Sequence, residues 1–178
     1  MTAVKSCVVA MLVGLMAGSL KTIDAAGPFG LALKPPMGFR SWNCMGKDVT
    51  QAKMQRAMDK LVEKRSYGGG DPISLADLGY ATAGLDDAWQ ACGTGINGSF
   101  HAADGTPLVN TTTFPDMGQM VEYGHKLGLA VGFYINNCIC AENMWRGDHA
   151  TEMVMFKGTV KAIADWDFDG VKIVRLCL

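Results

Sequence analysis

The stretch of sequence that decides the fold is a short apolar run closed by two adjacent carboxylates, and it reads Tyr80-Ala81-Thr82-Ala83-Gly84-Leu85-Asp86-Asp87-Ala88-Trp89-Gln90. Such a run predicts a buried strand, and the two acids then stand where that strand reaches the surface. Because neighbouring like charges repel, the pair is best tolerated where polar ligand groups such as sugar hydroxyls share it. Two acids after a strand are also typical of a turn and helix cap, so a functional interpretation needs further signals.

Strands and helices alternate on both sides of this stretch, four strands in all. The expected elements are a strand within 36–42, a helix capped by Asp48, the strand ending at Asp86, a helix from Asp116 to Leu127, a strand at 129–135, a helix at 151–167 and a strand from residue 170. Alternation of this kind, with strands apolar enough to be covered on both faces, predicts an α/β fold with a parallel sheet.

The first and last of these helices are each expected to bury one apolar face. Apolar side chains recur at helical spacing in both. They are Met54, Ala57, Met58, Leu61 and Val62 in the first helix, and Met153, Phe156, Val160, Ile163 and Ala164 in the last.

Residues 1–26 have the features of a secretory signal peptide. Lys5 gives a positive start, residues 8–20 are apolar, and small residues at 24–27 suit cleavage. A membrane anchor is the alternative, but the apolar stretch is short for a spanning helix. We therefore expect a domain over residues 27–178, secreted or lysosomal/vacuolar, with no membrane association in its mature form.

Composition favours a small neutral ligand. The chain of 178 residues has 16 Lys and Arg against 17 Asp and Glu, for a net charge of −1, and no basic patch that would favour nucleic acid. Asn97 and Asn110 begin glycosylation sequons, which agree with passage through a secretory compartment.

Six cysteines are present, and Cys7 leaves with the signal peptide. The remaining five cannot all pair with one another in an oxidising compartment. Cys138 and Cys140 are too few for a metal site, and the three histidines have no ligand spacing, so we expect neither a metal nor another cofactor.

Polar or aromatic residues end successive predicted strands. Trp42 ends the first, Asp86 and Asp87 the second, and Tyr134 with Asn136 and Asn137 the third. In (β/α)8 barrels the carboxyl ends of the strands converge on one active-site mouth, so these side chains are expected to face one ligand. An aromatic ring beside carboxylates and amides suits a sugar, because the ring stacks on the apolar sugar face and the acids accept from hydroxyls.

Five segments carry a resemblance to a known family, in order and in spacing. They are Leu31-Ala32-Leu33-Lys34-Pro35-Pro36-Met37-Gly38-Phe39-Arg40-Ser41-Trp42-Asn43, Gly84-Leu85-Asp86-Asp87-Ala88-Trp89-Gln90, Phe114-Pro115-Asp116-Met117, Gly132-Phe133-Tyr134 and Phe168-Asp169-Gly170-Val171-Lys172-Ile173. The chain resembles the family-27 glycoside hydrolases, the α-galactosidase (melibiase) group. The resemblance implies the N-terminal half of a TIM (β/α)8 barrel, about four βα units, without the second half of the barrel or the C-terminal β-sandwich. It also implies hydrolysis of terminal α-D-galactosyl residues, with retention of configuration, from an oligosaccharide, glycolipid or glycoprotein.

The resemblance also assigns roles to individual residues. It implies that the galactose pocket is lined by Trp42, Asp86, Asp87, Tyr134 and Lys172. It implies a disulfide between Cys44 and Cys92, although the family more often places the second partner directly after the paired acids, where this chain has Ala88. Cys177 stands one position beyond the family cysteine that bonds the strand-3 loop, here Cys138 or Cys140.

The family's catalytic groups are not matched. Its nucleophile is an Asp two residues after the strand-4 lysine, and Val174 stands there; its acid/base Asp lies two strands further on. Retaining hydrolysis needs two carboxyl groups about 5 Å apart on opposite sides of the bond, which adjacent residues such as Asp86 and Asp87 cannot provide. We therefore expect this chain to be inactive alone. Loss of agreement after Ile173 suggests a frame shift, a retained intron or a misassigned gene end, which sequencing the transcript there would test.

Two alternatives to the truncated α-galactosidase stay open. One is a non-catalytic galactose-binding pseudoenzyme that keeps the pocket of the first four strands. The other is a related hydrolase that takes α-N-acetylgalactosamine, since the family's strand-5 loop decides that choice.

Overall fold

The computed structural model describes residues 35–66, 68–136, 139–140 and 147–174, and Pro36–Leu178 form one compact unit. The predicted signal peptide, as well as Asn137, Cys138 and Cys177, lies outside the described residues. Within the described ranges, no helix has the length and apolar character needed to cross a membrane.

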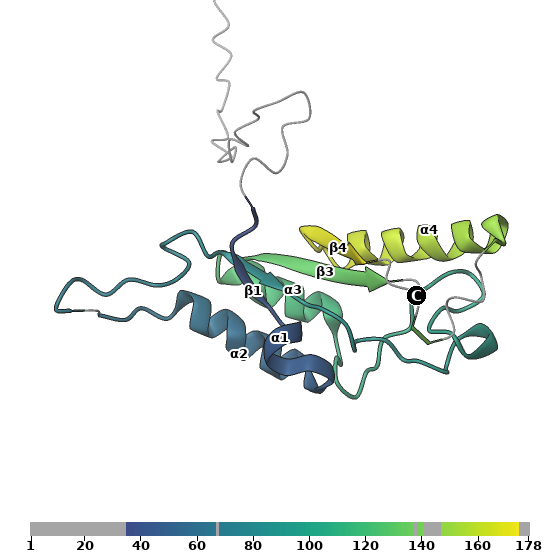
Figure 1. Ribbon diagram of the computed structural model, residues 1–178, viewed down its shortest axis with the longest axis horizontal. Coiled ribbons are helices and arrows are strands. Elements are labelled where there is room, and N and C mark those ends of the chain that lie inside the picture. The colour runs from purple at the N-terminus through teal and green to yellow at the C-terminus, as the bar shows by residue number, and fades with distance from the viewer. Residues whose placement is uncertain (1–34, 67, 137–138, 141–146, 175–178) are drawn as a thin grey trace, which may run out of the picture. The chain divides into compact units, whose positions relative to one another are not determined.

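The centre of the unit is a sheet of four parallel strands in the order β1-β2-β3-β4 (Figure 1). The strands are β1 (Gly38–Arg40), β2 (Thr82–Gly84), β3 (Ala130–Asn136) and β4 (Gly170–Val174). Sequential order with parallel pairing requires a crossover between each strand and the next, and the helices supply these crossovers. The predicted α/β alternation is confirmed.

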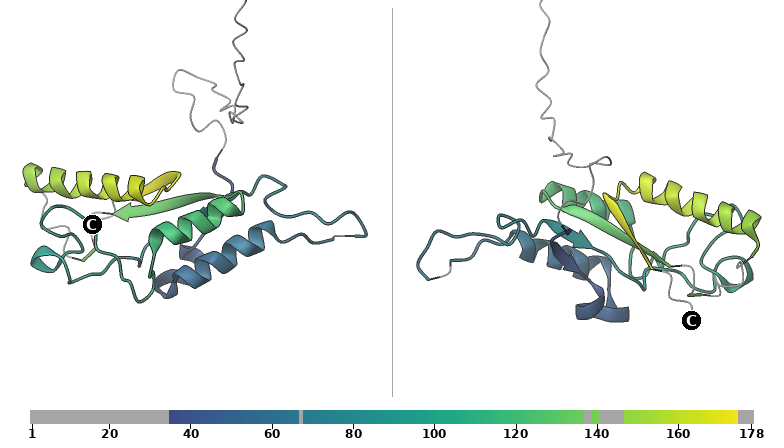
Figure 2. Two further views of the ribbon diagram at one scale, coloured as in Figure 1. Left: turned by 180° about the vertical axis from the view of Figure 1, so that it is seen from behind. Right: turned by 45° about the horizontal axis from the view of Figure 1, so that its top comes forward.

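Helices α2 (Gln51–Val62) and α3 (Met117–Lys126) lie side by side against the sheet (Figure 2). Between them and the strands lies an apolar core without solvent access, including Met54, Met58, Met120, Val131 and Phe133. The packing is close enough that a Cβ on Gly124 of α3 would approach Val131 Cγ2 to 2.4 Å. The buried face predicted for the first helix is confirmed at Met54, Met58 and Leu61.

The two helices begin at different kinds of cap. Asp116 accepts from the backbone N–H of Gln119 at 2.8 Å and opens α3, as predicted. For α2 the predicted cap at Asp48 is wrong: Thr50 has the extended backbone of an N-cap, and its hydroxyl accepts from the N–H of Lys53 at 3.2 Å. Asp48 instead ends the 3₁₀ turn η1 (Gly46–Asp48), which follows the short helix α1 (Trp42–Met45).

Helix α4 (His149–Asp165) forms where a helix was predicted but buries a different face. Met153, Phe156 and Val160 are exposed by 52%, 44% and 65%. The buried positions are instead Met155, Thr159 and Ala162. Ala164 is exposed as well and Ile163 is half-buried, so the expectation for this helix is wrong at four of its five predicted core positions.

The loop between β2 and α3 explains which face of α4 is covered. A Cβ on Gly158 of α4 would meet the backbone oxygen of Gly105, and Thr159 Oγ1 lies 2.9 Å from His101 Nε2. The loop contains the turn η2 (Ile96–Gly98) and is held by backbone hydrogen bonds, such as Leu108 N–H to Phe100 O at 2.6 Å. Small residues of α4 let the loop approach closely, so the helix turns its small side inward.

Candidate functional site

The register of the sheet places three predicted site residues on one face. Gly84, Gly132 and Gly170 are aligned across β2, β3 and β4, and Tyr134 pairs with Lys172. Side chains two residues apart on a strand share a face. Asp86, Tyr134 and Lys172 each follow an aligned glycine by two positions, so they form one layer at the carboxyl ends of the strands.

Asp86 binds two cationic side chains at this layer. Its Oδ1 accepts from Lys172 Nζ at 2.6 Å and its Oδ2 from Arg40 Nε at 3.0 Å. The Asp86 side chain is 2% exposed, whereas those of Arg40 and Lys172 are 36% and 41% exposed. Burial raises the pKa of the Asp86 carboxyl, but the hydrogen bonds from Lys172 and Arg40 outweigh burial and leave that pKa below its ordinary value of 3.8. Asp86 is therefore a carboxylate at neutral pH, with a cation on each oxygen.

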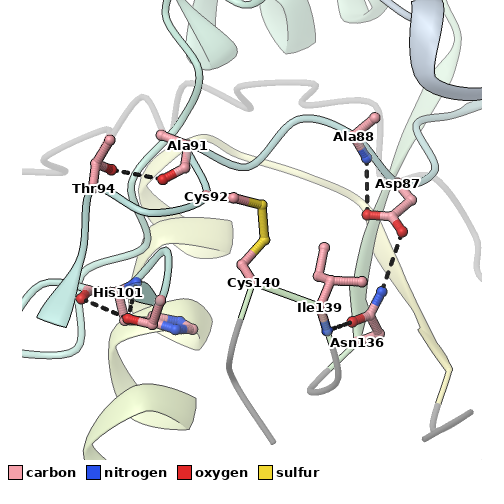
Figure 3. Close-up of a disulfide and its surroundings, with 10 residues drawn as sticks. Asp87, Ala88, Ala91, Cys92, Thr94, His101, Asn136, Ile139 and Cys140 are labelled. Atoms are coloured by element: carbon pink, nitrogen blue, oxygen red, sulfur yellow. Dashed lines mark hydrogen bonds between the residues drawn. A yellow bond between two sulfur atoms is a disulfide. The ribbon is translucent and has the colours of Figure 1, made fainter. Parts of the chain in front are cut away.

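Asp87 lies next to Asn136 at the end of β3 (Figure 3). Its Oδ1 accepts from the N–H of Ala88 at 2.8 Å, and its Oδ2 accepts from Asn136 Nδ2 at 3.4 Å. Asn136 Nδ2 also donates to the Tyr134 hydroxyl at 3.0 Å. Ala88 has a φ of 76°, which L-residues other than Asn and Asp seldom adopt, so the backbone is strained directly after the paired acids.

Lys172 connects the Asp86 carboxylate to the Tyr134 ring. Its Nζ lies 5.2 Å from the centroid of the Tyr134 ring, within the range of a cation–π contact. Tyr134 is mostly buried and accepts at its backbone oxygen from Trp89 Nε1 at 3.0 Å. Lys172 thus contacts two other predicted pocket residues, Asp86 and Tyr134, and Asp87 is linked to Tyr134 through Asn136.

Trp42 stands at the start of α1, directly after Ser41, and its side chain is 44% exposed. An exposed indole next to the strand ends has a free face for stacking on a ligand. Its role in sugar binding stays a prediction.

Two residues of the site were not singled out from the sequence: Arg40 and Ser41. Ser41 is fully buried, and its Oγ accepts from the N–H of Asp86 at 2.9 Å. A usable signal existed for Arg40, because a buried carboxylate needs a charged partner and Arg40 is the cation that ends β1.

The resemblance places Val174 where the family has its nucleophile, and this assignment stays a prediction. Val174 is aligned with Asn136 and follows Lys172 by two residues, so its side chain belongs to the same face of β4 as Lys172. An isopropyl group cannot attack an anomeric carbon. In the described site, this position contributes an apolar wall and no carboxyl group.

The predicted Cys44–Cys92 disulfide is wrong. Cys92 is bonded to Cys140, with 4.9 Å between their Cα atoms (Figure 3). Cys44 is a free, exposed thiol. Cys92 follows β2 and Cys140 follows β3, and these strands are neighbours, so the loops that leave them meet. Cys44 lies in α1 after β1. Among the described residues, no group of three or more His, Cys, Asp and Glu side chains could hold a metal ion.

Parallel strands with crossover helices and charged, amide and aromatic side chains at their carboxyl ends are the arrangement of (β/α)-barrel enzymes. Fold and site together define a segment of an enzyme of that class.

Comparison with known proteins gives the particular family. The chain is 31% identical over 108 residues to a probable α-galactosidase B from Talaromyces emersonii, covering 60% of this chain and 21% of that protein. It is 30% identical over 146 residues to an α-galactosidase from Cyamopsis tetragonoloba, covering 80% and 30%. The crystal structure of a putative α-galactosidase from Bacteroides fragilis superposes with a TM-score of 0.61 at 26% identity, covering 82% of this chain and 27% of that one. No family model matches the chain.

The chain is a homologue of the α-galactosidases of glycoside hydrolase family 27 over the part of their length that it spans. That part is 21% to 30% of the two curated relatives described above. The predicted resemblance and the barrel-type α/β fold are confirmed.

Proposed function

We propose that the strand-end layer binds the terminal galactose of α-galactosides, and that the chain derives from a hydrolase that removes this sugar with retention of configuration. The observation that carries the proposal is the joining of Asp86, Tyr134 and Lys172 in one layer. Three strands that are distant in sequence converge on this contact, which packing alone does not require.

Each polar group has a distinct task in this proposal. The Lys172 side chain is 41% exposed, and its ammonium donates to sugar oxygens, while Asp87 and Asn136 supply acceptors and donors at the opposite side of the layer. Trp42 stacks on the apolar face of the sugar. Asp86 lines the pocket from below, and because it is 2% exposed it acts mainly through the cations that it holds.

Hydrolysis is not expected from the described site. A retaining glycosidase attacks the anomeric carbon with one carboxylate and protonates the leaving oxygen with a second, about 5 Å away. Val174 stands at the attacking position, and Asp86 and Asp87 are adjacent residues on one strand end. The expected behaviour of this chain is therefore binding of galactose without turnover, as in a galactose-binding pseudoenzyme.

Calorimetric titration of the purified chain with D-galactose tests the proposal. We expect saturable binding that is lost in Lys172→Met and kept in Lys126→Met, a matched control on the exposed side of α3, where Lys126 pairs with Glu122. N-acetylgalactosamine as a second ligand separates the two sugar specificities. A folded wild-type chain that binds neither sugar contradicts the proposal, and release of nitrophenol from a nitrophenyl α-galactoside contradicts the account of Val174.

We also propose that the chain enters the secretory pathway and is secreted or delivered to a lysosome or vacuole. The exposed position of Asn97, in η2, supports a glycan there; Asn110 is half-buried, and its Oδ1 accepts from the N–H of Thr112 at 3.2 Å. Expression in a eukaryotic host with glycosidase digestion checks this. We expect Asn97→Gln to remove one glycan, whereas an unglycosylated wild-type chain retained in the cytosol argues against the route.

A further inference from the structure

A row of glycines crosses the sheet one level below the proposed sugar site. Gly84, Gly132 and Gly170 are aligned in register on β2, β3 and β4, and the residue aligned with them on β1 is Arg40. Aligned residues of parallel strands face the same side. At this level, therefore, three of the four strands offer no side chain, and the fourth offers a long cationic one.

Arg40 lies along this glycine row. A Cβ on Gly84 would come within 2.6 Å of Arg40 Nη1, and one on Gly132 within 3.4 Å of the same atom. The guanidinium reaches past β2 towards β3, where Nη2 donates to the backbone oxygens of Leu85 at 2.7 Å and Phe133 at 3.4 Å. Glycine at 84 and 132 is what lets the side chain lie flat on the sheet.

From this position Arg40 reaches upward into the site. Its Nε donates to Asp86 Oδ2, while Lys172 donates to the other oxygen of the same carboxylate. The N–H donors of a guanidinium lie in one plane at fixed angles, so they fix the orientation of a bound carboxylate as well as its distance. A flexible lysine ammonium fixes only the distance. The orientation of the Asp86 carboxylate, and hence the place of the Lys172 ammonium, follows from how Arg40 sits in the row.

We propose that Arg40 is a positioning residue of the sugar site: from the glycine row it orients Asp86 as a carboxylate, and Asp86 in turn fixes the Lys172 ammonium that faces the ligand. This inference rests on the proposed galactose site and adds to it the residue that sets its geometry.

The charges around Asp86 predict how its pKa changes when Arg40 is removed. Arg40 from β1 and Lys172 from β4 favour its ionised form, Asp87 next to it disfavours that form, and Tyr134 from β3 contacts Lys172. Without Arg40, burial is opposed by Lys172 alone, so the pKa of Asp86 rises. The carboxyl group then takes up a proton at a higher pH, and a neutral carboxyl no longer holds Lys172 in place.

Four variants separate positioning from simple folding. Arg40→Met removes the charge. Arg40→Lys keeps the charge but replaces the planar guanidinium with an ammonium. Gly84→Ala adds a methyl group that displaces the flexible end of Arg40 without changing any charge. Gly170→Ala is the matched control, because it lies in the same glycine row and its Cβ would meet nothing within 4 Å.

The measurement is the affinity for D-galactose between pH 7 and pH 4, on variants whose folding is verified by circular dichroism. We expect Arg40→Met and Gly84→Ala to bind about tenfold more weakly at pH 7 and to lose further affinity as the pH falls. Gly170→Ala should follow the wild-type profile, and Arg40→Lys should recover the profile in part. Folded Arg40→Met with wild-type affinity and a wild-type profile overturns the inference.

Titration of the Asp86 carboxyl by carbon-13 NMR makes failure of this inference distinguishable from failure of the proposed function. A wild-type chain that binds no galactose overturns the galactose site, whatever Arg40 does. If the Asp86 carboxyl titrates at the same pH in the wild type, Arg40→Met and Gly84→Ala, then Arg40 does not control the ionisation of Asp86. That result overturns the inference, whatever ligand is bound. A higher titration pH in those two variants, with Gly170→Ala unchanged, supports the inference.

Discussion

Asp86 shows how one buried residue links stability to the site. A carboxylate that is 2% exposed is stable only with its charge compensated, and Arg40 and Lys172 compensate it from two other strands. The same bonds that hold the strand ends together therefore shape the proposed pocket. Loss of Asp86 should therefore affect both the stability of the fold and the shape of the proposed pocket.

We predict that Asp86→Asn lowers the free energy of unfolding at pH 7 by about 2 kcal/mol, since two partly exposed cations lose their partner. The native pKa of Asp86 lies below its ordinary value of 3.8, so its stabilising contribution is present above that pH and is lost as the pH falls below it. Urea unfolding at pH 7 and pH 3 should therefore show a large difference between variant and wild type at pH 7 and a smaller one at pH 3. An equal difference at both pH values contradicts the lowered pKa.

Val174 permits a residue-scale test of where the sugar lies. We predict that Val174→Asp places a carboxylate on the face that carries Lys172, in reach of the anomeric carbon of a bound galactose. A 2-deoxy-2-fluorogalactosyl fluoride needs no proton donor to lose fluoride, so the variant should gain the mass of one fluorosugar in mass spectrometry. The control Val171→Asp, on the other face of β4, should stay unlabelled. Labelling of both variants, or of neither, contradicts the assigned face.

At the scale of helices and strands, features set by nearby residues are predictable from the sequence, whereas features set by distant packing partners are not. Helix α3 agrees with its prediction because Asp116 and the apolar face that follows it act within a few residues. The buried face of α4 was wrong because it depends on Gly105 and His101, about 50 residues away. Arg40 was also missed: the need of a buried Asp86 for a charged partner was a usable signal, but the partners of Arg40 lie on β2 and β3, far away in sequence. Asp86 and Tyr134 were predictable because parallel topology brings the strand ends together, whereas Lys172 was predicted from the family resemblance.

The start of α2 separates a sequence signal from the cap that the backbone uses. We predict that Thr50→Ala lowers the free energy of unfolding by about 1 kcal/mol, because the N–H of Lys53 loses its acceptor. Asp48→Ala should change it by less than about 0.5 kcal/mol, since Lys53 Nζ bonds the backbone oxygen of Asp48 and not its carboxylate. Thermal unfolding of both variants gives the comparison. A larger loss for Asp48→Ala would restore the cap that the sequence suggested.

At the scale of the whole molecule, six of the twelve large apolar side chains that are exposed among the described residues lie on the last βα unit, here α4 with β4. Ile173 of β4 is 69% exposed and Val160 of α4 is 65% exposed, and Val171, Met153 and Phe156 are also exposed. Both β1 and β4 have one neighbouring strand each in the described sheet, so each presents an unpaired edge. Exposed apolar side chains next to a free strand edge favour association.

We therefore predict that the purified 178-residue chain associates with itself as its concentration rises, and that the last βα unit is responsible. Sedimentation velocity of the wild type should show growing assemblies, and Val160→Glu with Ile173→Lys should shift the chain towards the monomer, because the two charges resist burial. Leu78→Lys is the control: Leu78 is 55% exposed, but it lies in the turn between α2 and β2. Equal effects of the control and the double variant would mean that general solubility, and not this surface, governs association. Galactose affinity measured on the monomeric double variant then shows whether the strand-end site works without a partner, because neither Val160 nor Ile173 lies in the layer of Asp86, Tyr134 and Lys172.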